Sequence, residues 1–237
     1  MTRPLLLLTR PGEEAEATAR AADAAGFETL SAPLLHIDAL DWSLPADAAP
    51  DALLFTSARA PHIVASRRPD LRSLPAYAVG PNTAAAAVGR AGFRLVSAGE
   101  TDGSAIVARA AAEGVRNLLH MAGEQAARLD VPEGIRLTRV PVYAARLAAG
   151  LPEAALEALR SGAVFATLLF SPRTAAHFRH LLDQHRLVAS AQRIIALSSA
   201  VAEAAGDGWQ DVGVAASPTR EQALAAAMAL WQGKRHG

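Results

Sequence analysis

Short apolar runs alternate with small-residue helical patterns along most of the chain. The clearest run, residues 53–55, ends at two hydroxyl residues, Thr56 and Ser57, and is followed by a pattern typical of a helix. The same arrangement returns at residues 168–170, which end at Ser171. Buried strands alternating with helices of about ten residues are typical of parallel sheets joined by right-handed crossovers. The pattern therefore predicts a flavodoxin-like α/β fold, with parallel sheets flanked by helices.

This arrangement belongs to an internal repeat. A long part with three strand–helix units occurs at residues 52–113 and again at 164–231, and the two copies are offset by roughly 115 residues. A short part with one strand, one helix and an extended segment occurs at residues 4–37 and 117–144. The simplest closed sheets pair each long part with the short part of the other copy. The repeat thus predicts two sheets of this exchanged composition.

This pairing sets the expected domain boundaries. Residues 38–135 are expected to form an inserted, continuous α/β domain, and residues 1–37 and 145–237 to form a discontinuous one. Two extended segments, 27–37 and 136–144, then form the bridge between the domains. With only these two connections, the bridge is expected to act as a hinge.

Each of the two extended segments contains one proline, Pro33 in the first and Pro141 in the second. Proline cannot donate a sheet hydrogen bond, so the first segment is expected to be an edge strand or a connector, and the second is expected to be extended. The other expected strands lie at residues 5–9, 52–56, 76–79, 94–97, 117–121, 164–170, 193–197 and 211–215.

Composition and charge exclude several classes of function. Of the 237 residues 51% are hydrophobic and 19% charged, yet no apolar run reaches the roughly 20 residues that span a bilayer. Acidic and basic residues balance at 23 each, so no global field attracts nucleic acid or a membrane surface. Without cysteine there is no disulfide or thiolate nucleophile, and the N-terminal leucine run is too short for a signal peptide. A soluble cytoplasmic protein is expected.

Hydroxyl residues, glycines and prolines occupy the turns that follow the expected strands. In an open parallel sheet these turns lie at the carboxyl edge, where ligands bind, and each offers backbone N–H groups to an anion. One such turn contributes only about 0.3–1 kcal/mol, and Ser and Thr are also ordinary helix caps. Repetition of the turns on both sheets favours a ligand with many carboxylates. The candidate binding residues are Arg10, Pro11, Thr56, Ser57, Gly80, Thr83, Gly103, Ser104, Gly123, Glu124, Ser171, Pro172, Ser199 and Thr219.

Cofactor and metal motifs are missing from the sequence. The chain has no GxGxxG, no GxxxxGK[ST] and no HExxH, which argues against dinucleotide, P-loop and zinc-protease chemistry. His177 and His180 share a helix, but no carboxylate at helical spacing completes a metal site, so a solvated helix face is favoured. For His36 and His120 a core or capping role is favoured over catalysis. No cofactor and no metal are expected.

Tyr143 is the candidate catalytic residue. It is one of two tyrosines and lies in a connecting segment, where we expect its phenol to point into a cleft and not into a domain core. A tyrosine is a poor base at neutral pH but a competent hydrogen-bond donor or weak acid. From the sequence alone, a structural role as a buried tyrosine stays open.

Seven short motifs follow one another along the chain: Leu8-Thr9-Arg10-Pro11, Phe55-Thr56-Ser57, Val79-Gly80-Pro81-Asn82-Thr83, Gly123-Glu124, Val140-Pro141-Val142-Tyr143, Phe170-Ser171-Pro172 and Pro218-Thr219. Their order and spacing resemble the uroporphyrinogen-III synthase family over nearly the whole chain. That family has two α/β domains joined by a two-stranded bridge, with the N-terminal strand in the same domain as the C-terminal half. One departure is Ala196-Leu197, which stands where the family usually shows Gly-Pro and removes a glycine from the turn before Ser199.

The resemblance implies a cofactor-free hydro-lyase. Its substrate would be hydroxymethylbilane, a linear tetrapyrrole with eight carboxylates, which closes with loss of water and inversion of ring D to uroporphyrinogen III, on the way to haem, sirohaem and cobalamin. In this reaction Tyr143 would donate a hydrogen bond to the departing hydroxyl. A monomer is expected, with transient contact to the upstream bilane-forming enzyme left open. The alternative is a non-enzymatic two-domain sensor or binding protein for a small acidic metabolite, which would use the same turns.

Overall fold

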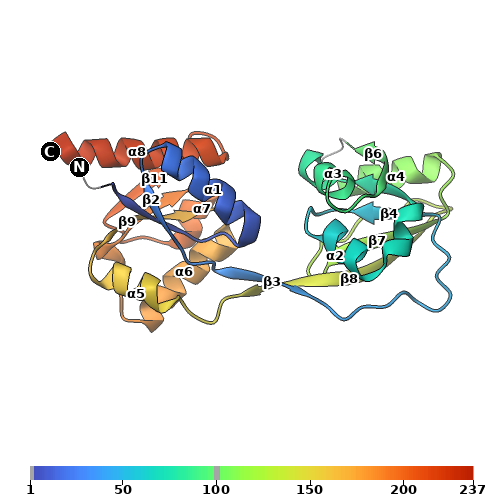
Figure 1. Ribbon diagram of the computed structural model, residues 1–237, viewed down its shortest axis with the longest axis horizontal. Coiled ribbons are helices and arrows are strands. Elements are labelled where there is room, and N and C mark those ends of the chain that lie inside the picture. Colours follow the sequence, from blue (N-terminus) through green and yellow to red (C-terminus); the bar gives the residue numbers. More distant parts are fainter. Residues whose placement is uncertain (1–2, 99–101, 237) are drawn as a thin grey trace. The chain divides into compact units, whose positions relative to one another are not determined.

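The computed structural model describes residues 3–98 and 102–236. Contacts divide this part of the chain into two compact units. The first unit holds the described residues up to His36 together with those from Arg146 onward, and the second unit holds Ile37–Ala145. Each unit contains one sheet with helices packed on it (Figure 1).

The sheet of the first unit has five strands in the order β11-β10-β9-β1-β2. Each pair of neighbouring strands is parallel, and the central strand β9 is buried along its whole length, as expected for a strand covered on both faces. The strands are β1 (Leu5–Leu8), β2 (Glu28–Ser31), β9 (Val164–Leu169), β10 (Arg193–Ala196) and β11 (Asp211–Val214). The helices are α1 (Gly12–Ala24), α5 (Glu153–Arg160), α6 (Pro172–Gln184), α7 (Ser199–Ala205) and α8 (Arg220–His236), with a 3-10 helix at Ala189–Ala191.

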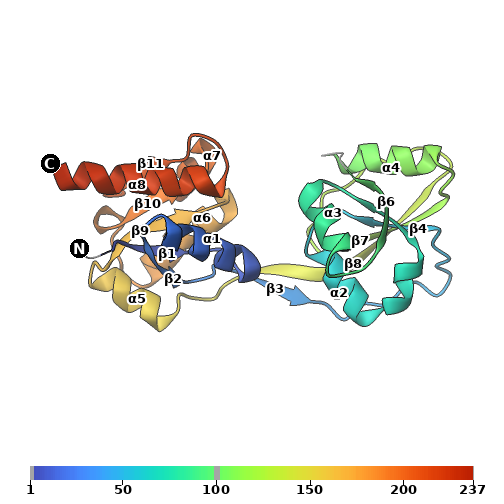
Figure 2. The ribbon, with the colours of Figure 1, turned by 45° about the horizontal axis from the view of Figure 1, so that its top comes forward.

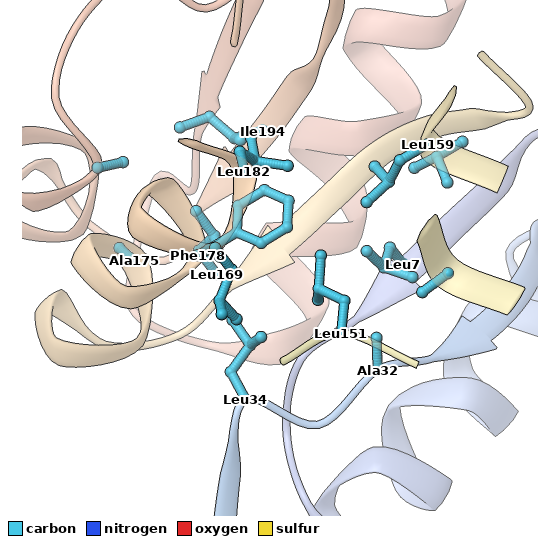
Figure 3. Close-up of a cluster of buried hydrophobic side chains, with 14 of the residues drawn as sticks. Leu7, Ala32, Leu34, Leu151, Leu159, Leu169, Ala175, Phe178, Leu182 and Ile194 are labelled. Atoms are coloured by element: carbon cyan, nitrogen blue, oxygen red, sulfur yellow. The ribbon is translucent and has the colours of Figure 1, made fainter. Parts of the chain in front are cut away.

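Helices cover both faces of this sheet. On one face Leu7 and Ile194 pack with Phe178 of α6, in a cluster that also includes side chains of α5 and α7 (Figure 3). On the other face Leu6 and Ile195 pack with side chains of α1 and α8. Neighbouring residues of a strand point to opposite faces, so the unbroken apolar runs of β1 and β10 supply both clusters.

The sheet of the second unit has six strands in the order β3-β8-β7-β4-β5-β6. The pairs from β8 through β6 are parallel. The strands are β3 (Leu35–Ala39), β4 (Ala52–Phe55), β5 (Pro75–Ala78), β6 (Arg94–Ala98), β7 (Asn117–Gly123) and β8 (Arg136–Leu147). The helices are α2 (Ala60–Arg67), α3 (Pro81–Val88) and α4 (Gly103–Ala112), with a 3-10 helix at Pro69–Ser73. The boundary between the units falls within β3 and β8.

This second sheet is also covered on both faces. Phe55 and Leu119 pack with side chains of α2 and α3, whereas Leu54 and Leu118 pack with Ile106 and its neighbours on α4. Figure 2 shows α2 and α4 on opposite sides of the sheet. The core of this unit is therefore two apolar layers, one on each side of the central strands β4 and β7.

The predicted fold class is confirmed, because in each unit the central strands form a parallel sheet that is flanked by helices. The exchange of parts is visible in the strand orders. Strands β1 and β2 lie beside β9, β10 and β11, while β7 and β8 lie beside β4, β5 and β6. Each short part of the repeat thus completes the sheet of the long part from the other copy.

The two proline-bearing segments take different forms in the structure. The first consists of two strands, because Pro33 lies between β2 and β3, which are edge strands of different sheets. The second is the extended strand β8, which lies between β3 and β7. Pro141 is accommodated because the register of β7 and β8 shifts after the pair Ala122 and Pro141. Proline is tolerated at such a bulge.

Candidate functional site

The candidate binding turns of the second unit lie along one edge of its sheet. Strand β4 ends just before Thr56 and Ser57, β5 ends two residues before Gly80, and β7 ends at Gly123. Since these strands are parallel, their carboxyl ends share an edge. The fold therefore brings these turns together, and their role in binding stays a prediction.

Tyr143 lies against Gly123 at this edge. A β-carbon built on Gly123 would come within 2.8 Å of Cζ and 2.9 Å of Oη of Tyr143. Only 8% of Tyr143 is exposed, and its side chain belongs to the hydrophobic cluster that contains Phe55 and Val142. The expectation that the phenol points away from the core is therefore wrong for the ring. Its hydroxyl has no hydrogen-bond partner among the described residues.

A bulge in β8 explains this placement. Residues 142–144 are buried one after another, whereas a regular strand alternates its two faces. The register shift sets Tyr143, and not Val142, opposite Gly123. An extra residue in one strand moves every later side chain to the other face. The bulge thus turns Tyr143 toward the side of the sheet on which Gly123 leaves room for its ring.

Thr56 and His120 form a polar pair near the same edge. The distance from Thr56 Oγ1 to His120 Nε2 is 2.9 Å, and His120 is only 2% exposed. Burial lowers the pKa of His120 to about 4, and the positive charge of Arg139 acts in the same direction, so the ring is neutral at pH 7. Its neighbour Met121 packs in the same cluster as Tyr143, so His120 faces the opposite side of the sheet. The buried, neutral ring agrees with the structural role favoured for His120.

The turn that leads into α4 is fixed by its own hydrogen bonds. Thr101, which the sequence pattern places at the start of this turn, lies outside the described residues. The Asp102 carboxylate accepts a hydrogen bond from the N–H of Ser104 over 3.0 Å and so caps α4. The hydroxyl of Ser104 in turn accepts one from the N–H of Asp130 over 3.0 Å. Ser104 therefore holds a neighbouring loop in place.

Two glycines of the candidate set are required by local geometry. A β-carbon on Gly103 would lie 2.7 Å from Cδ2 of Leu129 and 3.6 Å from Cγ2 of Thr56. Gly80, the residue before α3, has a φ of 78°, a conformation that residues with a β-carbon rarely adopt. Thr83, in the first turn of α3, is 5% exposed, so its side chain offers little surface to a ligand.

Arg10 leads the candidates in the first unit. Its guanidinium lies 3.2 Å from the Glu14 carboxylate and 4.5 Å from the centre of the Phe170 ring. Phe170 directly follows β9, which is the parallel neighbour of β1, so Arg10 spans the carboxyl ends of two adjacent strands. Its side chain keeps 30% of its surface exposed. Pro11 precedes the first residue of α1, and Pro172 is the first residue of α6.

Two hydroxyls of the first unit serve as helix caps. Ser171 Oγ accepts from the N–H of Thr174 over 3.2 Å, and Thr219 Oγ1 accepts from the N–H of Gln222 over 3.2 Å. Ser199 begins α7 and is exposed. Capping accounts for Ser171 and Thr219 without a ligand.

Arg139 is a residue of this edge that the sequence pattern does not indicate. Its Nη2 donates to the carbonyl oxygens of both Gly123, over 2.9 Å, and Glu124. The N–H of Glu124 donates to the carbonyl of Tyr143 over 2.8 Å. A single arginine in a strand matches no motif. Its only signal in the sequence is its place four residues before Tyr143.

No group of three or more metal-ligating side chains occurs within residues 3–98 and 102–236. His177 and His180 have ring centres 6.2 Å apart, but the Nε2 of His177 forms a hydrogen bond with the carbonyl of Ala148 over 2.7 Å. The helix face that the sequence predicts to be solvated is thus only half-exposed at His177. In the described residues no helix is both long and apolar enough to cross a membrane.

The fold and its turns define a duplicated α/β protein, in which the parallel strands of each sheet are followed by glycine- and hydroxyl-bearing turns at their carboxyl ends. Within that class, the model of one family, uroporphyrinogen-III synthase HemD, matches residues 16–225. The chain belongs to this family and is an enzyme of tetrapyrrole synthesis. The alternative of a non-enzymatic sensor is not favoured.

Solved structures show the same fold. The uroporphyrinogen-III synthetase of Helicobacter pylori 26695 is similar with a TM-score of 0.62 at 17% identity, covering 97% of this chain and 100% of the other. A mutant uroporphyrinogen III synthase of the extremely thermophilic bacterium Thermus thermophilus is similar with a TM-score of 0.51 at 15% identity, covering 99% and 100%. No curated protein sequence matches the chain.

Proposed function

We propose that the chain converts hydroxymethylbilane to uroporphyrinogen III as a carbon–oxygen lyase. Membership of the uroporphyrinogen-III synthase family supports this reaction. The parallel sheets supply what an octacarboxylate needs, namely several turns with exposed N–H groups and helix N-termini at one edge of each sheet.

The reaction divides into steps with different demands. The ring A hydroxymethyl carbon loses its hydroxyl, which takes the bonding electron pair and one proton and departs as water. The azafulvene left behind is attacked by the substituted carbon of ring D, and the spiro intermediate fragments, recloses inverted and releases a proton. Because an electron-rich pyrrole expels hydroxide readily, the enzyme's larger task is to orient ring D.

Tyr143 is the proposed donor to the departing hydroxyl. The observation that supports this role is the packing of Tyr143 against Gly123. The ring is buried in a hydrophobic cluster, while the hydroxyl has no hydrogen-bond partner in the described part of the chain. A packed ring with a spare O–H is a preorganised donor, since little conformational freedom is lost when it binds the leaving group. General acid assistance of this kind is typically worth roughly 10²–10⁴-fold in rate.

Binding is proposed to use both charge and backbone. Arg10 supplies a guanidinium that keeps exposed surface beside its ion pair with Glu14, and Arg59 and Arg173 are further candidates. Glycine and hydroxyl turns supply N–H groups for the remaining carboxylates. The proposed contacts in the second unit are Thr56, Ser57, Gly80, Thr83, Gly103, Ser104, Gly123 and Glu124. Those in the first unit are Arg10, Pro11, Ser171, Pro172, Ser199 and Thr219.

The proposal also includes the setting of the enzyme. A cytoplasmic monomer is proposed. Sedimentation equilibrium tests this directly: a single species at the monomer mass supports it, and a concentration-dependent dimer contradicts it.

The function is tested by adding the protein to a reaction that generates hydroxymethylbilane. Left alone, the bilane closes without inversion to the symmetrical type I isomer. The proposal predicts that the protein redirects the product to type III, as seen by chromatography of the oxidised porphyrins. Binding of the bilane without a change of isomer would instead support the sensor.

A further inference from the structure

The turn at the carboxyl end of β7 is held from two sides. On one side Nη2 of Arg139 donates to the carbonyls of Gly123 and Glu124. On the other side the N–H of Glu124 donates to the carbonyl of Tyr143 over 2.8 Å. A third hydrogen bond, from the N–H of Ala126 to the Gly123 carbonyl over 3.0 Å, closes the turn on itself. The turn therefore links the guanidinium of Arg139 to the backbone of Tyr143.

The position of this turn also fixes the ring of Tyr143. The Gly123 Cα lies so close to the ring that an added β-carbon would sit 2.8 Å from Cζ and 2.9 Å from Oη. A shift of a few tenths of an ångström in Gly123 would either press on the ring or open a gap beneath it. The position of Gly123 thus limits where the hydroxyl end of the Tyr143 ring can lie.

An arginine suits this task for a chemical reason. Two carbonyls of consecutive residues point to one side, and the two N–H bonds of a single guanidinium nitrogen can serve both at once. Hydrogen bonds from a charged donor are stronger than neutral ones, which favours a fixed turn over a mobile one. Pro141, at the bulge, has no N–H and so donates no backbone hydrogen bond at this end of the strand.

We infer that Arg139 is a positioning residue for the proposed reaction: it clamps the Gly123-Glu124 turn and thereby sets the hydroxyl of Tyr143. The expected effect of Arg139 on turnover rests on the proposed function. Its expected effect on the position of the Tyr143 ring rests on geometry alone. In this role Arg139 acts through the turn and the ring, and not by direct contact with the reacting atoms. Misplacement of a catalytic group by about 1 Å can cost on the order of 10²-fold in rate, so loss of the clamp should be visible in turnover.

The structural consequence is tested by tyrosine labelled with ¹³C at Cζ. The chain has 2 tyrosines, so two signals are expected. Tyr77 is the internal reference, because it is 2% exposed and its hydroxyl donates to Glu113 over 2.6 Å. The signal that disappears in Tyr143→Phe belongs to Tyr143, and the signal that remains belongs to Tyr77. Arg139→Gln should shift or broaden the Tyr143 signal and leave that of Tyr77 in place.

The matched control is Arg136→Gln. Arg136 lies on the same strand, is exposed, and its nearest carboxylate is that of Asp47 at 4.0 Å. This variant should move neither signal and should keep full activity. An unchanged Tyr143 signal in Arg139→Gln would overturn the inference, and so would an equal shift in Arg136→Gln.

The kinetic consequence is tested by a double-mutant cycle. Arg139→Gln should lower kcat at least about fivefold with little change in KM, and by less than twofold when Tyr143 is already phenylalanine. Arg139→Lys should restore part of the loss, and it replaces the glutamine variant if that one does not fold. Equal losses in both backgrounds would overturn the inference. A wild-type chain that fails to act on the bilane would refute the proposed function. The ¹³C spectra would still show whether Arg139 positions the Tyr143 ring.

Discussion

Gly123 and Tyr143 fit together so closely that no side chain can be added between them: a β-carbon on Gly123 would lie 2.8 Å from Cζ of Tyr143. Real contacts of a β-carbon are longer, so one of the two residues must move when Gly123 is replaced. The other glycine near the carboxyl edge of this sheet with such a contact, Gly103, meets the flexible end of Leu129 and not an aromatic ring. The glycine at the end of β7 is therefore required by the tyrosine ring that packs against it.

The first prediction follows from this contact. Gly123→Ala should displace the Tyr143 ring, lower kcat by at least about tenfold and leave the circular dichroism spectrum unchanged, because the loss is one of geometry. The matched control is Gly233→Ala, where an added β-carbon meets nothing within 4 Å and φ is ordinary. That variant should keep full activity and gain up to about 1 kcal/mol in helix α8. Full activity in Gly123→Ala would show that the position of the Tyr143 ring does not affect turnover.

The second prediction concerns a buried hydroxyl. Thr167 Oγ1, in the centre of β9, is 1% exposed and has no hydrogen-bond partner in the described structure. Thr167→Val removes this unpaired group at nearly constant shape and should raise the free energy of unfolding by about 1 kcal/mol. Urea denaturation measures the change.

A second buried threonine provides the control. Thr18 is 0% exposed, but its hydroxyl donates to the carbonyl of Glu14 over 2.7 Å. Thr18→Val should therefore lower stability, by about 1 kcal/mol, since a made hydrogen bond is lost. If both variants change stability with the same sign, the unpaired state of Thr167 does not matter.

The third prediction is a pH dependence. The pKa of His120 is about 4 in the folded chain, below its ordinary value of 6.5, so the unfolded chain binds a proton first as pH falls. The contribution of neutral His120 to the free energy of unfolding is intact above about pH 6.5. It is lost as pH falls toward 4, which lowers the free energy of unfolding by up to roughly 3 kcal/mol. His120→Gln should flatten the stability profile between pH 6.5 and 4. Exposed His62→Gln should keep it, and an equally steep profile in His120→Gln would place the titrating group elsewhere.

The fourth prediction concerns binding by Arg10. Arg10→Ala should raise KM for the bilane more than it lowers kcat, because a carboxylate contact made by both substrate and transition state is lost. Arg20 is the control: it also pairs with a glutamate four residues away on α1, Glu16 at 3.9 Å, but is 73% exposed. Arg20→Ala should leave both constants unchanged. A fall in kcat without a rise in KM would move Arg10 from binding into the chemical step.

The internal repeat accounts for much of what the sequence could predict. Hydrophobic runs such as residues 53–55 and 168–170 are long enough to mark central strands, and the order of the repeated parts indicates which strands share a sheet. Elements that depend on local apolar patterns were therefore placed well. For example, the strand predicted at residues 52–56 is found at Ala52–Phe55.

The sequence could not predict what depends on contacts between strands. The bulge that turns Tyr143 inward is a register shift between β7 and β8, and no local pattern around Pro141 encodes it. The same holds for Arg139, whose role comes from carbonyl groups in the neighbouring strand's turn. The pairing of His120 with Thr56 likewise joins residues 64 positions apart in the chain.

We propose that this chain closes hydroxymethylbilane with inversion of ring D and that the hydroxyl of Tyr143 assists the loss of water. Both proposals are tested by the time course of type I and type III product for the wild-type chain and for Tyr143→Phe, separated by chromatography. The wild-type chain should give type III almost alone. Tyr143→Phe should fold and bind substrate normally, turn over at least tenfold more slowly, and let more bilane escape to type I. A wild-type chain that leaves type I as the main product would contradict the claim as a whole, and wild-type turnover in Tyr143→Phe would remove the phenol from the mechanism.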